Sequence, residues 1–138
     1  MRIFLDTNII LDFLTARHPF DKDALEIFRL STEDKLTIHI SALSYGQIGY
    51  FLEKQLGKPN ARLRLNDLFN LTQVVDVSHQ IIQQAIQSDL PDFEDAIQHE
   101  CAIQINKLHS FISRDLKHYK KASVLVQTPK EFLDTYNY

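Results

Sequence analysis

Three aspartates, far apart in the sequence, are the residues best suited to carry out chemistry. Asp6 directly follows the apolar run 2–5, Asp115 follows a second apolar run at 110–113, and Asp95 lies near the start of a helical pattern. If both runs are strands of a parallel sheet, the carboxylates gather at its carboxyl edge, where open α/β folds bind ligands. Carboxylates without cysteine or paired histidine favour a hard cation, Mg²⁺ or Mn²⁺, over zinc. The spacing therefore predicts an acidic metal site.

Each aspartate also has an ordinary structural role open to it. Asp6 is a suitable N-cap for a helix that begins near Ile9. Asp95 complements the dipole in the first turn of its helix, and Asp115 suits a turn after a strand. Taken one at a time, the structural roles are favoured. The shared placement at one sheet edge shifts the balance towards a metal site.

Short apolar runs alternate with longer segments of helical spacing along the whole chain. The expected strands are 2–5, 35–40, 73–77, 110–113 and 123–126, and the expected helices are 9–14, 22–30, 43–56, 61–71, 80–88 and 93–107, with a short last helix from Pro129. This alternation predicts βαβ units and a three-layer α/β fold, a mainly parallel sheet of about five strands flanked by helices. No linker-like stretch and no repeat interrupts residues 1–138, so we expect a single domain.

Composition narrows the class of protein further. With 138 residues, 44% hydrophobic and 24% charged, the chain is not collagen-like or disordered. The single cysteine, Cys101, excludes an internal disulfide, and the N-terminal residues have no signal-peptide layout. No apolar run approaches about 18 residues. We therefore expect a cytoplasmic protein with no membrane partner. A net charge of -3 argues against a polycation but leaves nucleic acid open.

Four segments resemble motifs of the PIN domain family, in the family's order. Residues 3–8 (IFLDTN) resemble its first strand with the Asp-Thr-Asn signature, 90–96 (LPDFEDA) its second acidic motif, 111–115 (FISRD) its third, and 126–133 (VQTPKEFL) its closing segment. The chain is thus similar to the VapC-type toxin ribonucleases. The resemblance implies a Mg²⁺- or Mn²⁺-dependent endoribonuclease that hydrolyses RNA, the toxin of a type II toxin–antitoxin pair. It also implies a cognate antitoxin partner and a homodimer.

The resemblance also implies roles for individual residues. Asp6, Asp95 and Asp115 would be the catalytic, metal-binding acids, with supporting roles for Asn8, Gln47 and Ser113.

Two positions depart from the usual family pattern. Gln47 occupies or adjoins the position of a common metal-binding Glu, and an amide brings an oxygen but no charge. Glu94 would compensate, as in family branches that have an Asp-Phe-Glu-Asp-Ala motif and lack that Glu. His118 stands where many relatives have Asp. The alternative is therefore a catalytically impaired PIN-fold protein that binds RNA or a partner.

Basic residues surround Asp115. Residues 107–121 hold five Lys and Arg against one acid, whereas 89–100 hold five acids and no Lys or Arg. Because phosphates are repelled by carboxylates and attracted by cations, RNA is expected at this basic segment. The expected contacts are Arg114, Lys117, Lys120 and Lys121. An ordinary solvated turn is an equally good explanation, and the other RNA path lies along Lys54, Lys58, Arg62 and Arg64.

A receiver-like signalling domain is the rival from another class, since it also gathers acids at strand ends. It needs an acceptor aspartate after the third strand. Asp76 fits poorly, because it is expected within the strand 73–77.

Overall fold

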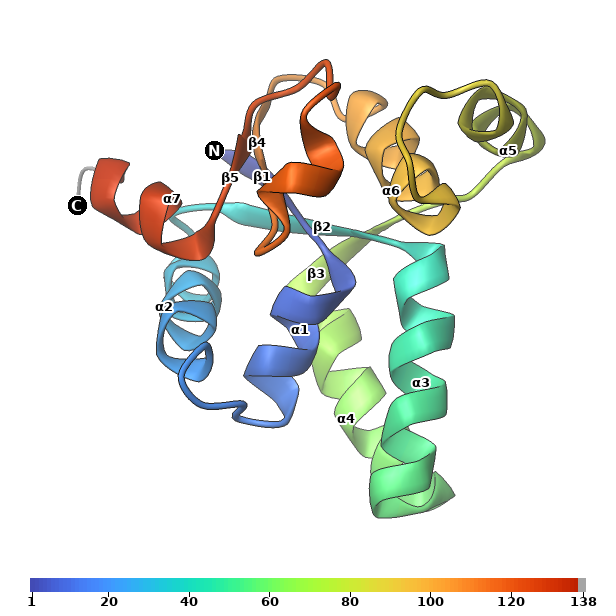
Figure 1. The fold of residues 1–138 in the computed structure, drawn as a ribbon. Coiled ribbons are helices and arrows are strands. Elements are labelled where there is room, and N and C mark those ends of the chain that lie inside the picture. Colours follow the sequence, from blue (N-terminus) through green and yellow to red (C-terminus); the bar gives the residue numbers. More distant parts are fainter. Residues whose placement is uncertain (137–138) are drawn as a thin grey trace.

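The computed structural model describes residues 1–136, and within them five strands form one parallel sheet (Figure 1). The strands are β1 (Arg2–Leu5), β2 (Thr37–Ser41), β3 (Thr72–Val75), β4 (Leu108–Ile112) and β5 (Val126–Gln127). The helices are α1 (Thr7–Leu14), α2 (Asp21–Thr32), α3 (Ala42–Leu56), α4 (Lys58–Leu71), α5 (His79–Ile86), α6 (Phe93–Ile103) and α7 (Pro129–Thr135), with a 3₁₀ turn, η1 (Leu116–Tyr119). The expected three-layer α/β fold is confirmed.

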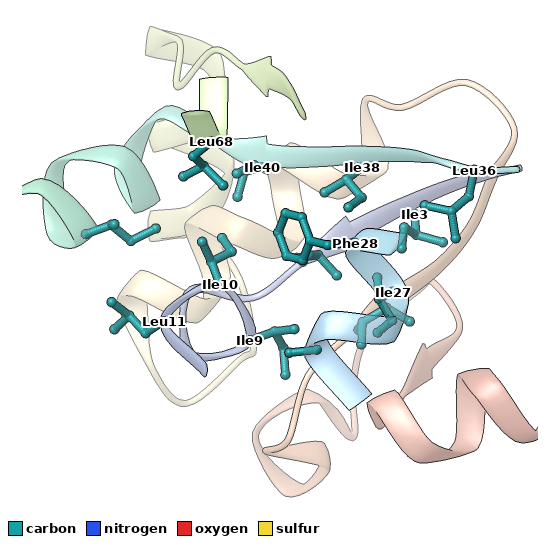
Figure 2. Close-up of a cluster of buried hydrophobic side chains, with 14 of the residues drawn as sticks. Ile3, Ile9, Ile10, Leu11, Ile27, Phe28, Leu36, Ile38, Ile40 and Leu68 are labelled. Atoms are coloured by element: carbon teal, nitrogen blue, oxygen red, sulfur yellow. The ribbon is translucent and has the colours of Figure 1, made fainter. Parts of the chain in front are cut away.

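Both faces of the sheet are buried, and β1 shows how. Successive side chains of a strand point to opposite faces. Ile3 and Leu5 therefore join the cluster formed with α1, α2, α3, α4 and α7, part of which Figure 2 shows. Phe4 joins the cluster on the other face, with α5, α6 and η1. Each fully buried side chain of this size contributes about 1.5–3 kcal/mol. This double burial explains why the strands are apolar runs.

The order of the strands places the site. The sheet order is β3-β2-β1-β4-β5, so the chain moves outward in one direction from β1 and then crosses back to β4. The carboxyl ends of β1 and β4 border the crevice at this reversal, which is where open α/β sheets bind ligands. Asp6 follows β1 and Ser113 follows β4. This order also differs from the 2-1-3-4-5 order of receiver-like folds, which excludes that rival.

Most element boundaries differ from the prediction by one to four residues, and three of these differences change the surroundings of the site. The last strand lies at Val126–Gln127 instead of 123–126, because the Ser123 amide donates to His99 Nε2 and not to a strand. Helix α6 ends at Ile103, four residues early, and a turn follows in which Lys107 has a φ of 59°. Strand β3 ends at Val75, so Asp76 lies after the strand.

No helix within residues 1–136 has the length and apolar character needed to cross a membrane.

Candidate active site

Asp6 lies at the centre of a buried hydrogen-bond network in the crevice between β1 and β4. Its Oδ1 accepts from the Thr7 amide at 2.7 Å and from Gln98 Nε2 at 3.0 Å. Its Oδ2 accepts from the Ser113 hydroxyl at 2.8 Å. One carboxylate thus connects α1, α6 and the end of β4.

Burial dominates the titration of this carboxylate. Burial raises the pKa of Asp6, the hydrogen bonds from Ser113 and Gln98 lower it, and the charge of Asp115 raises it further. The net shift of the Asp6 pKa is upward. The fold therefore holds a charge here at a cost, which a cation would offset.

The other two predicted acids lie beside Asp6 and share one histidine. His118 Nδ1 is 3.0 Å from Asp95 Oδ2 and 3.6 Å from Asp115 Oδ2. The Ser113 hydroxyl that donates to Asp6 also accepts from the Asp115 amide at 3.0 Å. The pKa of Asp95 is raised, first by burial and then by the charge of Asp6. The structure therefore brings the three aspartates together.

Gln47, on α3, connects the starts of α1 and α6 through its side-chain amide. Its Oε1 accepts from the Thr7 hydroxyl at 3.0 Å, and its Nε2 donates to Glu94 Oε2 at 2.5 Å. The Thr7 hydroxyl also lies 2.7 Å from the Ser44 hydroxyl. Gln47 thereby places Glu94 at the rim of the acidic cluster. Asn8 is exposed in the first turn of α1 and lies outside this network.

The structural alternative is also present at Asp6. The Asp6 side chain is the N-cap of α1, as the helix-cap interpretation expects. Asp95 lies in the first turn of α6, where Asp92 is the N-cap. Capping and clustering thus coexist, and the cap alone does not explain why Asp6 is buried next to two further carboxylates.

The donor set suits a hard divalent cation. All the acids offer oxygen, and a cation would offset both the burial and the neighbouring negative charges that raise the pKa values of Asp6 and Asp95. Burial and then the charges of Asp6 and Asp95 also raise the pKa of the Tyr119 hydroxyl beside them. As the side chains lie, no three His, Cys, Asp or Glu within the described part of the chain form a ready metal-binding group. The His118 imidazole lies within 3.6 Å of both Asp95 and Asp115. A cation that contacts both would displace the imidazole.

The predicted RNA-binding residues divide into two groups. Lys117, Lys120 and Lys121 line a hollow of about 230 Å³ together with His118, next to the acids. Arg114 does not join them. Its Nε and Nη2 donate to Asp12 Oδ2 at 2.9 Å and Oδ1 at 3.2 Å, and Asp12 is only 1% exposed.

Several residues of the network were not predicted from the sequence. Gln98 lies three positions after Asp95 on α6, and Ser44 lies three positions before Gln47 on α3, so helical spacing alone could have placed them on the site face. Asp12 interrupts the apolar run of α1, which is a signal for a buried, paired charge. Tyr119 had no comparable signal.

The protein is an α/β protein with a parallel sheet and a cluster of carboxylates where the strand order reverses. A comparison with family profiles identifies its family. The profile of the PIN domain matches residues 2–117. The chain belongs to the PIN domain family. Comparison with curated protein sequences finds no match.

Solved structures of toxin–antitoxin proteins share the fold. A chain of VapBC2 from Rickettsia felis, solved with a DNA fragment from its promoter, is 18% identical with a TM-score of 0.70, and 93% of this chain and 98% of that chain are covered. A chain of a toxin–antitoxin complex from Klebsiella pneumoniae is 21% identical with a TM-score of 0.68, and 92% of this chain and 97% of that chain are covered. VapC20 from Mycobacterium tuberculosis, described as a sarcin–ricin loop cleaving toxin, is 18% identical with a TM-score of 0.65, and 89% of this chain and 96% of that chain are covered. At these identities the likeness establishes the fold.

Proposed function

We propose that this PIN domain is an endoribonuclease that requires Mg²⁺ or Mn²⁺. The observation that carries the proposal is the convergence of Asp6, Asp95 and Asp115 at the crevice between β1 and β4. Two comparisons support it. PIN nucleases generally use divalent metals, and VapC20, which shares the fold, is described as cleaving the sarcin–ricin loop.

The residues divide the work by their positions. Asp6, Asp95 and Asp115 would hold the cation, which supplies polarisation of the scissile phosphate and a lower pKa of the attacking water. Ser113 fixes Asp6 and the Asp115 backbone relative to each other through its two hydrogen bonds. Glu94, placed by Gln47, adds negative charge at the rim.

The three lysines would hold the RNA backbone. Lys117, Lys120 and Lys121 offer cations next to acids that would otherwise repel phosphate. Arg114 cannot serve in the same way, because Asp12 already binds its guanidinium.

An RNA cleavage assay tests the proposal. Purified protein is incubated with end-labelled RNA in Mn²⁺, in Mg²⁺ and in EDTA, alongside Asp6→Asn. We expect cleavage with either metal, none in EDTA, and none with Asp6→Asn. Cleavage that persists in EDTA contradicts the metal requirement, and equal cleavage by Asp6→Asn contradicts the site.

We further propose that the enzyme is a homodimeric toxin with an antitoxin partner. Structures that share its fold include VapBC and other toxin–antitoxin complexes. The test is expression of the chain with and without the small protein encoded directly upstream. Growth arrest that the neighbour relieves supports a toxin, and normal growth with active enzyme points to another role. Light scattering of the purified chain tests the dimer.

The second candidate is a PIN-fold protein that binds RNA without cutting it. His118 between Asp95 and Asp115 favours this candidate, since an imidazole takes the place that a cation would use. RNA binding without cleavage at any Mn²⁺ concentration would establish it. In that case His118→Asp, which restores a fourth acid, should be the change that brings cleavage.

A further inference from the structure

A second hollow lies at the carboxyl edge of the sheet, away from the three lysines. Its volume is about 270 Å³, and its lining residues come from the start of α2, the segment after β4 and the start of α7: Phe20, Asp23, Arg114, Thr128, Pro129 and Lys130. The Ser113 amide donates to the Gln127 carbonyl at 2.9 Å, which holds the β4 and β5 ends of this wall together.

The hollow adjoins the acidic cluster through the backbone. Arg114 lines the hollow, and the next residue is Asp115. Lys117 and His118, a few residues further, line the first hollow, the one that Lys120 and Lys121 share, beside the α5–α6 connection. The short segment that carries Asp115 therefore lies between two hollows, one lined by residues at the starts of α2 and α7 and the other by residues of η1 and the α5–α6 connection.

The walls of this hollow include a fixed, flat and largely apolar surface. Phe20 is 41% exposed although it is a large aromatic residue, and the Arg114 guanidinium carbon lies 3.8 Å from the centre of its ring. Asp12 holds that guanidinium from behind through two hydrogen bonds, so Arg114 is already positioned. Pro129 adds a buried apolar edge. The Arg114 guanidinium covers one face of the Phe20 ring, so a planar group would stack on the exposed part of this pair.

The polar groups at the hollow suit the edge of a planar heterocycle. Asp23 offers acceptors, Lys130 offers donors, and the Thr128 hydroxyl offers both. Nucleobases stack on aromatic and guanidinium planes and use these same polar groups along their edges.

We propose that this hollow binds one nucleobase of the RNA, directly beside the phosphodiester bond at the acidic cluster. The inference rests on the proposed ribonuclease function and adds a recognition site to it. The RNA backbone lies across the three lysines, passes the aspartates, and inserts a base against Phe20.

The test measures RNA affinity in EDTA, where the proposed cleavage is blocked. The probe is a labelled single-stranded RNA oligonucleotide that the wild-type chain cleaves, and its binding is followed by fluorescence anisotropy. Phe20→Ala should weaken binding about tenfold or more, as removal of base stacking does. Phe20→Trp should retain the affinity, because it keeps an aromatic plane. Phe69→Ala on α4 is the matched control, since Phe69 is exposed to 59% and lies outside both hollows.

A set of oligonucleotides with one abasic position each identifies the bound base. One abasic position should reproduce the weaker binding of Phe20→Ala and should add nothing to it, because both changes remove the same interaction. Thermal melting of each variant checks that it is folded.

Two outcomes separate this inference from the proposed function. If Phe20→Ala binds RNA as Phe69→Ala does, the nucleobase assignment is overturned, and the hollow is left for a side chain of a protein partner, with the ribonuclease proposal intact. If the wild-type chain neither binds nor cleaves any RNA, the ribonuclease proposal itself fails.

Discussion

At the scale of single residues, the negative charge of Asp6 is not needed for its function as the N-cap of α1. Asn caps helices as well as Asp does, so an amide at position 6 would satisfy α1. The Asp6 carboxylate is buried beside Asp95 and Asp115, and burial raises its pKa. A costly charge with an inexpensive neutral substitute is typical of a functional site, where stability is given up for activity.

Asp6→Asn should therefore separate stability from activity. The raised pKa means that the folded state keeps the Asp6 proton to higher pH than the unfolded chain does. The free energy of unfolding thus falls as pH rises from about 3.9 through the folded pKa. The variant does not have this pH-dependent decrease, so at pH 7 we expect stability equal to or above that of the wild type. This advantage should disappear below about pH 4. Urea denaturation at several pH values measures it.

Cleavage by the same variant should fall more than about 100-fold, because changes to residues that merely orient metal ligands already cost 10–100-fold. Asp6→Ala is the control for the cap, and its stability should be lower by about 0.5–2 kcal/mol. An Asn variant that is as unstable as the Ala variant would show that the carboxylate is structural.

Gln47→Glu should strengthen metal binding and lower the thermal stability of the metal-free protein. The new carboxylate replaces an amide that donates to Glu94, so the two acids repel each other until a cation binds. We expect a lower melting temperature in EDTA and an affinity for Mn²⁺ about tenfold higher in calorimetry.

Gln55→Glu adds the same charge at an exposed position on the same helix and should change neither quantity. Unchanged Mn²⁺ affinity in Gln47→Glu would show that Glu94 or another acid already fills the role.

The sequence sufficed to place the acids but not their partners. Asp6, Asp95 and Asp115 follow from strand ends and a helix start, which are local signals. The positions of Gln98 Nε2 on Asp6 and His118 between two acids depend on how α6 and η1 pack on the second face of the sheet. Side-chain contacts of this kind are tertiary, and no spacing in the chain specifies them.

At the scale of elements, an ion pair around a buried carboxylate ties α1 to the segment after β4. Asp12, in the second turn of α1, receives two hydrogen bonds from Arg114, and Arg17 Nε lies 3.6 Å from the same carboxylate. Since Asp115 is the next residue after Arg114, this pair also positions the third acid of the cluster.

Asp12→Ala should destabilise the fold by about 3 kcal/mol, because it leaves the half-buried Arg114 charge without its partner. Urea denaturation gives the free energy of unfolding. Asp134→Ala is the matched control, since Asp134 pairs with Lys130 on the exposed surface of α7 and should cost less than about 1 kcal/mol. A cost for Asp12→Ala no larger than that of the control would show that Arg114 finds solvent or Asp23 instead.

The elements themselves were largely predictable, and the exceptions have local causes. Helix α3 ends at Leu56, and its C-cap Gly57 has a φ of 79°, as a glycine after a helical pattern indicates. The apolar run 123–126 resembled a strand, yet the Ser123 amide donates to His99 on α6, and the pairing with β4 begins only at the Leu125 carbonyl and Val126. Apolar character did not predict burial there, since Leu125 is 55% exposed and Val124 and Val126 are only partly buried.

At the scale of the whole molecule, the distribution of charged residues is more informative than the net charge. The net charge is only -3, yet acids gather at the start of α6 and cations along η1 and the turn after it. Because a polyanion approaches through its phosphates, this division should fix where RNA lies relative to the carboxylates.

The combined substitution of Lys117, Lys120 and Lys121 with Ala should weaken RNA binding and flatten its salt dependence. For every phosphate that is no longer neutralised, the slope of log affinity against log salt should become shallower by about 0.7–1. Anisotropy titrations in EDTA from low to moderate salt measure this slope. The matched control is Ala at Lys54, Lys58 and Arg64, which removes the same charge from α3 and α4. If the control flattens the slope and the substitution of Lys117, Lys120 and Lys121 does not, RNA binds along α3 and α4. The lysines near Asp115 are then part of an ordinary solvated turn.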